Sequence, residues 1–446
     1  MDNGRPARHS IEKQVHSMQT APLPSHTPRL SARSCGALLL IGLFGQIAWT
    51  VENMYFNVFL YNTITQDTGM IALMVAASAV VATLTTLLMG ALSDHLGRRK
   101  AFISLGYLLW GLSVMAFALV GPSAAPTIEG IRRAALTVVL LDCVMTFFGS
   151  TANDAAFNAW VNDITVPRNR GRVEGLLAML PLLSMLLVFG ALDPLTQSGR
   201  WQTFFLIVGS LTILAGLASL LLVKEQPINP SREGYVQQLV YGFLPQTVRA
   251  HPHLYTALMA MLALSTATQV YMPYLIIYIQ SYLGIADYAL ILAVVLLGAS
   301  ALSLLGGRLI DRLGKAALSF PALALAMAGL VGMFFVRGAS GLMIFGLCAI
   351  GGSMVMTACI NGLLRDGIPE GMGGRFQGVR MIFAVMLPMI IGPFLGSFVI
   401  GRGGATYTDL GVIKQVPTPA IFLAAAVVLL LSIPPLVKLR RREARL

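Results

Sequence analysis

Two carboxylic acids lie deep inside long apolar runs, and they are the residues best placed to do chemistry. Glu52 lies in the run Gly36–Leu60, and Asp142 lies in the run Ala134–Phe157. An ionisable side chain within a membrane span costs about 2.5–3.5 kcal/mol on insertion scales, so it is functional by default. A carboxyl in such a place can hold a proton and release it again. The two acids therefore predict a proton-coupling site, and separate structural hydrogen bonding by each acid is the alternative.

Other polar side chains recur at helical spacing in these two runs and in two later ones. In the first run Glu52 lies about 100° from Asn53, on the side of Trp49. It therefore either reaches a cavity beside an aromatic ring or packs towards a neighbouring helix. Amides bind hydroxyl groups and aromatic rings stack on sugar faces, so these residues suit a neutral, hydroxyl-rich ligand. The predicted cavity residues are Gln46, Trp49, Asn53, Thr146, Asn153, Gln269, Tyr274, Thr357 and Asn361.

Twelve apolar runs must position these side chains. The 446 residues are 56% hydrophobic and only 11% charged, whereas a soluble domain carries about 25% charged residues, so a lipid bilayer is the expected solvent. A spanning helix needs about 20 mostly apolar residues. Tyr278 and Tyr282 are assigned to an aromatic belt at the membrane interface. The predicted spans are Gly36–Leu60, Met70–Leu92, Ala101–Val120, Ala134–Phe157, Val173–Leu192, Trp201–Val223, Leu254–Gln280, Tyr288–Leu305, Ala316–Val336, Leu342–Leu364, Phe376–Ile400 and Thr418–Leu436.

Two charged turns recur half a chain apart. GALSDHLGRRK starts at Gly90, between the second and third runs, and GRLIDRLGK starts at Gly307, between the eighth and ninth. After the fourth run, Asp163 and Arg172 recur 203 positions later as Asp366 and Arg375. Both repeats keep the same in/out sense, which predicts two parallel six-helix halves related by an axis along the membrane normal.

The distribution of basic residues predicts the orientation. With the N-terminus inside, 25 of the 31 Lys and Arg residues lie on the cytoplasmic side, as the positive-inside rule requires, and a nucleic-acid partner is not expected. Both acids then fall in the outer half of the membrane at similar depth. The predicted organisation is a disordered cytoplasmic tail (1–34), a first bundle (35–223), a cytoplasmic linker (224–252), a second bundle (253–437) and a basic cytoplasmic tail (438–446).

The twelve spans, with G-x-x-x-D-x-x-G-[RK] after spans two and eight, resemble the major facilitator superfamily from about Gly36 to Val437. The first motif copy matches at every position, and the second has a lone Lys315 at its end. The resemblance implies an all-α membrane transporter whose halves rock around a central site. It also implies that spans one and four line the cavity of the first half, which favours one shared site for Glu52 and Asp142.

The resemblance further implies a cytoplasmic gate at the charged turns. Asp94 would meet the start of span eleven near Arg375, and Asp311 would meet the start of span five near Arg172. Each exposed contact would be worth at most about 1 kcal/mol, which suits contacts that break in every cycle. Tight turns that merely obey the positive-inside rule are the alternative. The predicted gate residues are Gly90, Asp94, Gly97, Arg98, Arg99, Asp163, Arg172, Asp311, Gly314, Lys315, Asp366 and Arg375.

Absent motifs narrow the predicted function. There is no Walker motif for ATP, no pair of intramembrane bases for a phosphate and no Cys/His cluster with metal-ligand spacing, so neither a cofactor nor an enzymatic activity is expected. The chain resembles the glycoside–pentoside–hexuronide cation symporters, but Met70–Leu92 lacks the acids of their sodium-site members, which favours protons. The sequence therefore predicts proton-coupled import of a sugar or glycoside by a monomer in the inner cell membrane. The alternatives are an efflux carrier for an apolar compound and a non-transporting membrane sensor or scaffold.

Overall fold

The computed structural model describes residues 31–121, 127–165, 167–225, 241–369, 373–403, 406–409 and 412–443. Within these residues, twelve helices are long and apolar enough to cross a membrane, which confirms the prediction of twelve spans. The predicted N-terminal tail up to residue 30 and residues 226–240 of the predicted linker lie outside the described part of the chain.

The first six spans are called helices one to six. Some are single α-helices, and the others contain π-helical or 3₁₀ turns. Helix one is α2 (Ala32–Thr50), η1 (Val51–Tyr55), α3 (Phe56–Phe59) and η2 (Leu60–Ile64); helix two is α4 (Thr68–Leu96); helix three is α5 (Arg99–Ala116) and η3 (Phe117–Leu119); helix four is α6 (Ile128–Gly149), η4 (Ser150–Phe157) and α7 (Asn158–Ile164); helix five is α8 (Pro167–Leu187), η5 (Val188–Leu192) and α9 (Asp193–Gln197); helix six is α10 (Trp201–Leu222).

The second half repeats this order after the short helix α12 (Pro245–Ala250). Helix seven is α13 (Pro252–Tyr271), η6 (Met272–Tyr274), α14 (Leu275–Ile277) and η7 (Tyr278–Tyr282); helix eight is α15 (Tyr288–Leu313); helix nine is α16 (Lys315–Phe335); helix ten is α17 (Ala339–Gly367); helix eleven is α18 (Gly373–Met381), η8 (Ile382–Met386) and α19 (Leu387–Arg402); helix twelve is α20 (Ala420–Leu430) and α21 (Ile433–Glu443).

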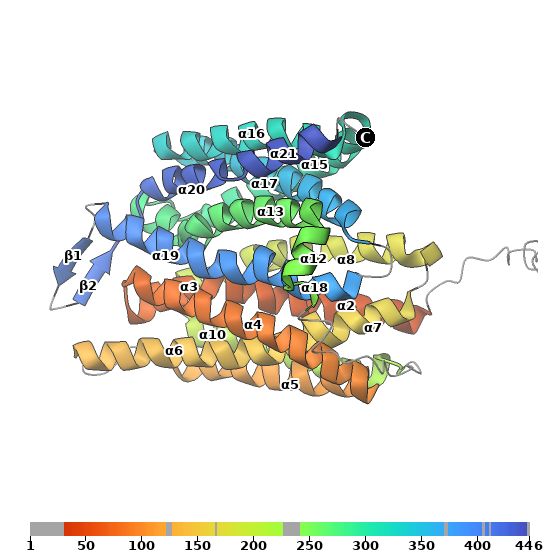
Figure 1. Ribbon diagram of the computed structural model, residues 1–446. Coiled ribbons are helices and arrows are strands. Elements are labelled where there is room, and N and C mark those ends of the chain that lie inside the picture. The colour runs from red at the N-terminus through yellow and green to blue at the C-terminus, as the bar shows by residue number, and fades with distance from the viewer. Residues whose placement is uncertain are drawn as a thin grey trace, which may run out of the picture.

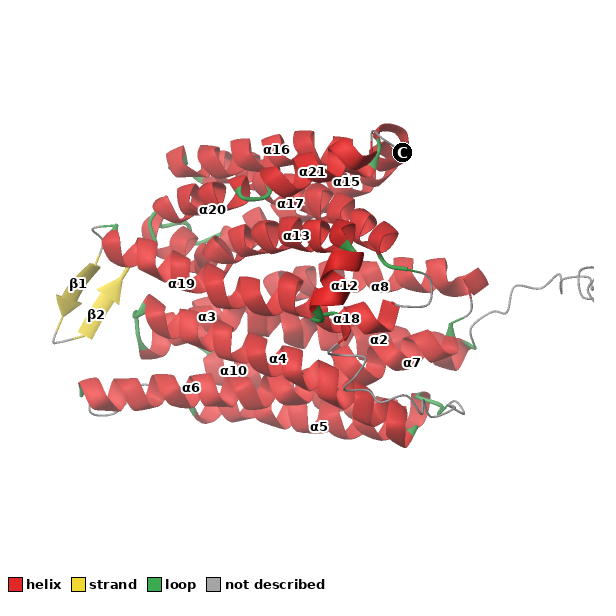
Figure 2. Cartoon of the chain, in the orientation of Figure 1, coloured by secondary structure: helices red, strands yellow, loops and turns green. Residues whose placement is uncertain are grey.

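The helices lie side by side, with the first half below the second in the view of Figure 1. A hairpin of β1 (Thr406–Asp409) and β2 (Val412–Gln415) lies at one end of the bundle, and Thr406 pairs with Gln415 across it. We call this the hairpin end. Helix one begins and helix twelve ends at the opposite end, which we call the terminal end. Figure 2 shows that the rest of the described chain is almost entirely helical.

Local sequence signals explain where α4 begins and ends. The Asp67 carboxylate caps α4 by accepting a hydrogen bond from the Gly69 backbone N–H at 2.8 Å. The same helix ends at Gly97, whose φ of 65° lies in the left-handed region that only glycine enters without strain. The Gly97 N–H donates to the Ser93 carbonyl at 3.0 Å and closes the last turn. The glycine spacing of the charged turn therefore serves a tight reversal into α5.

Small residues let neighbouring helices approach closely in both halves. A Cβ atom on Gly111 of α5 would lie 2.6 Å from the Gly209 carbonyl oxygen of α10. A Cβ atom on Gly329 of α16 would lie 2.2 Å from the Ala349 nitrogen of α17. Because lipid tails are as apolar as the helices, such close packing is a main source of association between membrane helices.

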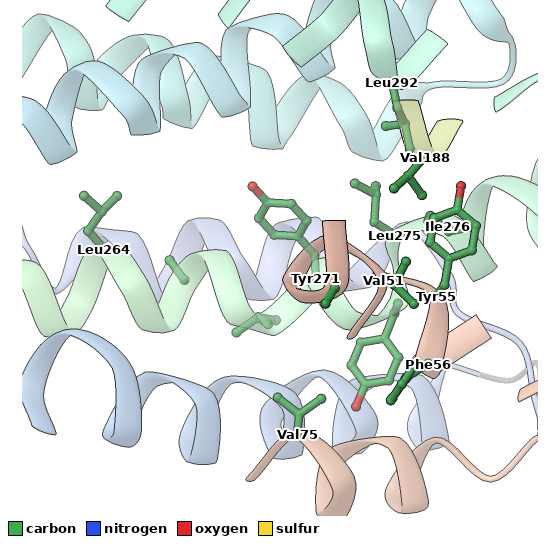
Figure 3. Packing of buried hydrophobic residues seen from close by; sticks show 14 of the residues in the cluster. Val51, Tyr55, Phe56, Val75, Val188, Leu264, Tyr271, Leu275, Ile276 and Leu292 are labelled. Carbon is green, nitrogen blue, oxygen red and sulfur yellow. The ribbon is translucent and has the colours of Figure 1, made fainter. Parts of the chain in front are cut away.

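One buried apolar cluster connects the two halves. Figure 3 shows Val51, Tyr55 and Val188 from the first half, and Tyr271 and Leu275 from the second, as members of that cluster. Large leucines also point outward, such as Leu140, which is 66% exposed. The bundle is thus apolar inside and outside, as a lipid-embedded fold requires.

Candidate functional site

A cavity of about 270 Å³ lies between the two halves, in the middle of the bundle. Helices one, two, four and five supply its walls from the first half, and helices seven and eleven supply them from the second. The lining residues are Gln46, Trp49, Thr50, Glu52, Asn53, Met54, Asn57, Met74, Val75, Ser78, Asp142, Pro181, Met185, Thr268, Gln269, Met272, Pro273 and Met389.

The structure brings Glu52 and Asp142 to this one cavity. Glu52 lies in the π-helical segment η1, and its Oε1 accepts a hydrogen bond from the Thr146 hydroxyl at 2.8 Å. Thr146 lies one turn after Asp142 on α6, so the hydrogen bond joins helices one and four beside both acids. A π-helical turn advances less per residue than an α-helical one. Glu52 and Asn53 both line the cavity, although helical spacing sets them about 100° apart.

Four buried polar atoms of the lining have no hydrogen-bond partner among the residues that the structure describes. They are Trp49 Nε1, Glu52 Oε2, Asn57 Oδ1 and Asp142 Oδ1. A buried polar group without a partner costs about 1–3 kcal/mol, so such groups gathered in one cavity indicate a ligand or water. When the acids are ionised, the set offers one donor and three acceptors. The arrangement fits a solute that brings several O–H or N–H donors.

Five methionines complete the cavity wall, and sequence reasoning did not find them. Met54, Met74, Met185, Met272 and Met389 come from five different helices. Thioether side chains are polarisable and flexible, so they adapt to irregular apolar surfaces. No spacing rule marks them in a chain that has 22 methionines. The cavity lining therefore combines adaptable apolar side chains with polar groups, most of them from helices one and four.

The remaining predicted cavity residues are placed as follows. The cavity is lined by Gln46, Trp49, Asn53 and Gln269. Thr146 does not line it but donates a hydrogen bond to Glu52, which does. Asn153, Tyr274, Thr357 and Asn361 do not line it.

Each of these four side chains has a partner elsewhere. Asn153 accepts from the Tyr107 hydroxyl at 2.9 Å, and Thr357 donates to its own helix at the Ser353 carbonyl at 2.8 Å. Asn361 accepts a hydrogen bond from Arg380 at 3.2 Å. The contacts of Asn153 and Asn361 join neighbouring helices within one half. The Tyr274 hydroxyl donates to the Pro393 carbonyl of helix eleven at 2.7 Å.

Tyr278 does not belong to an interfacial belt, in contrast to the expectation. Its side chain is fully buried, and its ring packs edge-on against Phe422 at 5.1 Å between ring centroids. Tyr282, which stacks on Tyr278, is exposed. The π-helical turn η7 lies at the end of helix seven, where helix twelve covers one of its faces, so only the outer tyrosine reaches the surface.

At the terminal end, the charged turn of the first half forms an ion-pair cluster within its own half. Arg99 is buried and pairs with Asp94 and with Asp163, the latter at 3.1 Å. Its Nη1 also donates to the Ser93 hydroxyl at 2.6 Å. Arg98 is exposed, and Gly90 accepts from Ser93 at 3.0 Å. Asp94 therefore pairs with Arg99, the first residue of α5, and the family resemblance does not imply this contact.

The second half repeats this cluster in simpler form. Lys315 pairs with Asp366 at 2.5 Å, joining the start of α16 to the end of α17. Gly314 precedes it with a φ of 86°. The side chains of Arg172, Asp311 and Arg375 lie outside what the structure describes, so the predicted contacts of Asp94 with Arg375 and of Asp311 with Arg172 remain predictions.

Comparison with known proteins agrees with the geometry. Residues 38–393 match the family model of the Major Facilitator Superfamily, and the chain belongs to that family as a multi-pass secondary transporter. A mutant form of the nucleoside transporter NupG is similar over 90% of this chain and 98% of its own, with a TM-score of 0.71 and 11% identity. A bacterial homolog of the human lysosomal transporter Spinster, inward-facing and unoccupied, is similar over 92% of this chain and 95% of its own, with a TM-score of 0.62 and 14% identity. No curated protein sequence matches the chain.

Proposed function

We propose that this transporter imports a small neutral solute of the sugar or glycoside class together with protons. The observation that supports this most directly is that two carboxyls and two further unpartnered polar atoms line a single cavity between the halves. The carboxyls can carry the proton, and the cavity acceptors suit hydroxyl donors of the solute. Among the described residues, the lining contains no Lys or Arg, which disfavours an anionic solute. Protons rather than sodium are proposed because helix two brings no acid to the cavity.

The size and mixed character of the cavity narrow the solute class. A volume of about 270 Å³ holds a monosaccharide with a modest substituent. Polar atoms from helix one suit the hydroxyl groups, and the methionines suit the substituent. NupG is named as a nucleoside transporter, and a nucleoside is an N-glycoside, so nucleosides belong among the solutes to test. At 11% identity this likeness shows the fold alone.

An efflux carrier for an apolar compound is the second candidate, and the five methionines favour it. A non-transporting sensor or scaffold is disfavoured, because unpartnered polar atoms in a cavity stabilise no fold. The test uses proteoliposomes with an imposed proton gradient and a panel of free sugars, aryl glycosides, nucleosides and apolar amphiphiles. Uphill accumulation of a neutral hydroxylated solute supports the proposal. Movement of apolar amphiphiles alone supports the efflux carrier, and transport of none of the panel contradicts both.

Substitution in the cavity provides a sharper check once a solute is identified. Asn57→Val is expected to raise the half-saturation concentration of uptake roughly threefold to tenfold, because one hydrogen bond to the solute is worth about 0.5–1.5 kcal/mol. Thr357→Val is the matched control, because its hydroxyl bonds only to the backbone of its own helix. Equal effects of the two substitutions would place the binding site elsewhere.

We propose that the terminal end faces the cytoplasm of a cell with the transporter in its inner membrane. The segments 1–34, 224–252 and 438–446 would then all be cytoplasmic, and the two bundles would work as a monomer. In a background in which the four native cysteines are replaced, Gln246→Cys on α12 is expected to react with a membrane-impermeant thiol reagent only in inverted vesicles. Ser198→Cys, at the hairpin end, should react only in right-side-out vesicles; both side chains are exposed. The reverse pattern would overturn the orientation.

A further inference from the structure

Asp193 is a buried acid that the cavity chemistry does not use. It is the first residue of α9, near the hairpin end of helix five, and only 1% of its surface is exposed. Among the described residues, no Lys, Arg or His forms an ion pair with it. A buried carboxylate without a cation must be stabilised by hydrogen bonds from neutral donors, since it would otherwise leave the interior.

Three of those donors come from the same half as Asp193. The Tyr55 hydroxyl of helix one donates to Oδ1 at 2.8 Å. The Thr196 hydroxyl also approaches Oδ1, at 3.3 Å, and Gln197 Nε2 donates to Oδ2 at 2.6 Å. These groups move with Asp193 when one half rocks against the other. They therefore stabilise the acid equally in every state of the transporter.

The fourth donor comes from the opposite half. The Tyr288 hydroxyl, on the first residue of α15, donates to the same Oδ1 atom. Tyr288 is fully buried. Gln197 Nε2 makes a second hydrogen bond between the halves by donating to the Ala286 carbonyl at 3.2 Å. Opening of the hairpin end separates helix five from helix eight. It must therefore break a hydrogen bond to a charged group in a site away from water.

The other pair of facing helices at this end is joined differently. The offset of 203 residues between the halves makes Gly396 on helix eleven the counterpart of Asp193, and Ser397 follows it. The Ser397 hydroxyl meets the Thr68 hydroxyl of helix two at 2.9 Å, and Tyr274 donates weakly to the Thr68 carbonyl at 3.3 Å. Thr68 and the Gln415 side chain also form a hydrogen bond. All of these are contacts between neutral groups, so each is weaker than a hydrogen bond to a carboxylate.

We propose that Asp193 and Tyr288 form the principal hydrogen bond that keeps the hairpin end closed, and that this bond sets the population of the state open at that end. The acid acts as a positioning residue: it touches neither the cavity nor the solute. This role depends on the alternating movement of the two halves and not on the identity of the solute or the coupling ion. Uptake of any substrate through the hairpin end would depend on breaking this contact.

The proposal is tested by the rate at which a cavity cysteine reacts from the hairpin side. Val75→Cys lies in the cavity wall and differs little in size, so an impermeant thiol reagent added on that side reaches it only when the hairpin end opens. Ser198→Cys first establishes which side of the vesicle that is. Tyr288→Phe removes only the hydroxyl. It is expected to raise the rate at least tenfold, since a hydrogen bond to a charged group changes an equilibrium constant by roughly one to two powers of ten.

Two matched tyrosines separate this role from a general loss of structure. Tyr55→Phe removes a donor to the same carboxylate from within its own half, and a rise of at most twofold is expected. Tyr278→Phe removes a buried hydroxyl that has no partner, and no change is expected. Asp193→Asn keeps the shape but removes the charge, and should also speed labelling. An unchanged rate in Tyr288→Phe, or an equal rise in Tyr55→Phe, would overturn the proposal.

Discussion

Asp142→Asn is expected to abolish uphill accumulation of the solute while leaving exchange of solute down its own gradient intact. Asp142 is 2% exposed, lines the cavity and has one carboxylate oxygen without a partner. Removal from water favours the neutral, protonated form of a carboxyl, and the neighbouring Glu52 opposes ionisation of both acids together. Asparagine has nearly the same shape but holds no transferable proton. The substitution should therefore uncouple transport without emptying the binding site.

The measurement is substrate-induced alkalinisation of a lightly buffered medium, together with counterflow of labelled solute in the same cells. Glu52→Gln is expected to behave in the same way, because Glu52 faces the cavity and not a packed helix. Glu129→Gln is the matched control: it is also an acid-to-amide change, but this acid is exposed and pairs with Arg133 one turn away. If Asp142→Asn still moves protons with the solute at the normal ratio, the proton carrier is another group.

Much of the fold could be predicted because a bilayer imposes simple rules. Apolar runs of spanning length must be helices, and the turns between them can be recognised by glycine and charge. Gly97 shows why the motif is informative: its left-handed backbone and the hydrogen bond to Ser93 make the tight turn that the spacing predicted. The hairpin β1–β2 was not predicted. It lies in a short polar loop, where no long run of alternating residues marks a strand.

Glu52 and Asp142 could be predicted as site residues because a charge inside an apolar run is costly wherever it occurs. Other parts of the site depend on geometry that helical spacing does not contain. Glu52 lines the cavity from a π-helical turn of helix one, whereas Asn153 and Tyr274 form hydrogen bonds elsewhere. The methionines carry no charge or pattern, so only the packed structure places them in the wall.

Asp193 shows where the sequence signal stops. It lies one residue beyond the predicted end of span five and precedes Pro194, so it has the local character of a loop acid. One of its hydrogen-bond partners is Tyr288, 95 residues later in the chain. No local pattern links these two residues. Only the packing of helix five against helix eight shows that the acid is shared between the halves.

Asp94 also has a partner nearby in the sequence, Arg99, in addition to the distant partner that the family resemblance implies. The family resemblance led us to expect a contact with the far half near Arg375, and the structure shows a bond to Arg99 in the same half. Pairing of Asp94 with helix eleven in another state remains a prediction. In the structure, Arg99 holds the turn of the first half together through its ion pairs with Asp94 and Asp163.

Arg99→Gln is therefore expected to lower the free energy of unfolding by about 3 kcal/mol, at the low end of the range for breaking a buried ion pair. Arg99 is 5% exposed, and its removal takes away the ion-pair partner of Asp163 and the donor to the Ser93 hydroxyl. The contribution of Asp94 is smaller, because about half of its side chain is exposed and screened by water. The loss should appear as a lower midpoint of thermal unfolding of the purified protein in detergent.

Arg98→Gln provides the control for this effect. The two arginines are adjacent, carry the same charge and obey the positive-inside rule equally, but Arg98 is exposed and Arg99 is buried. If the basic residues served only topology, both substitutions would change stability to the same small extent. A structural role confined to Arg99 predicts a midpoint several degrees lower for Arg99→Gln and an unchanged midpoint for Arg98→Gln. Equal midpoints would show that the buried cluster adds nothing to the stability of the turn beyond the tight bend at Gly97.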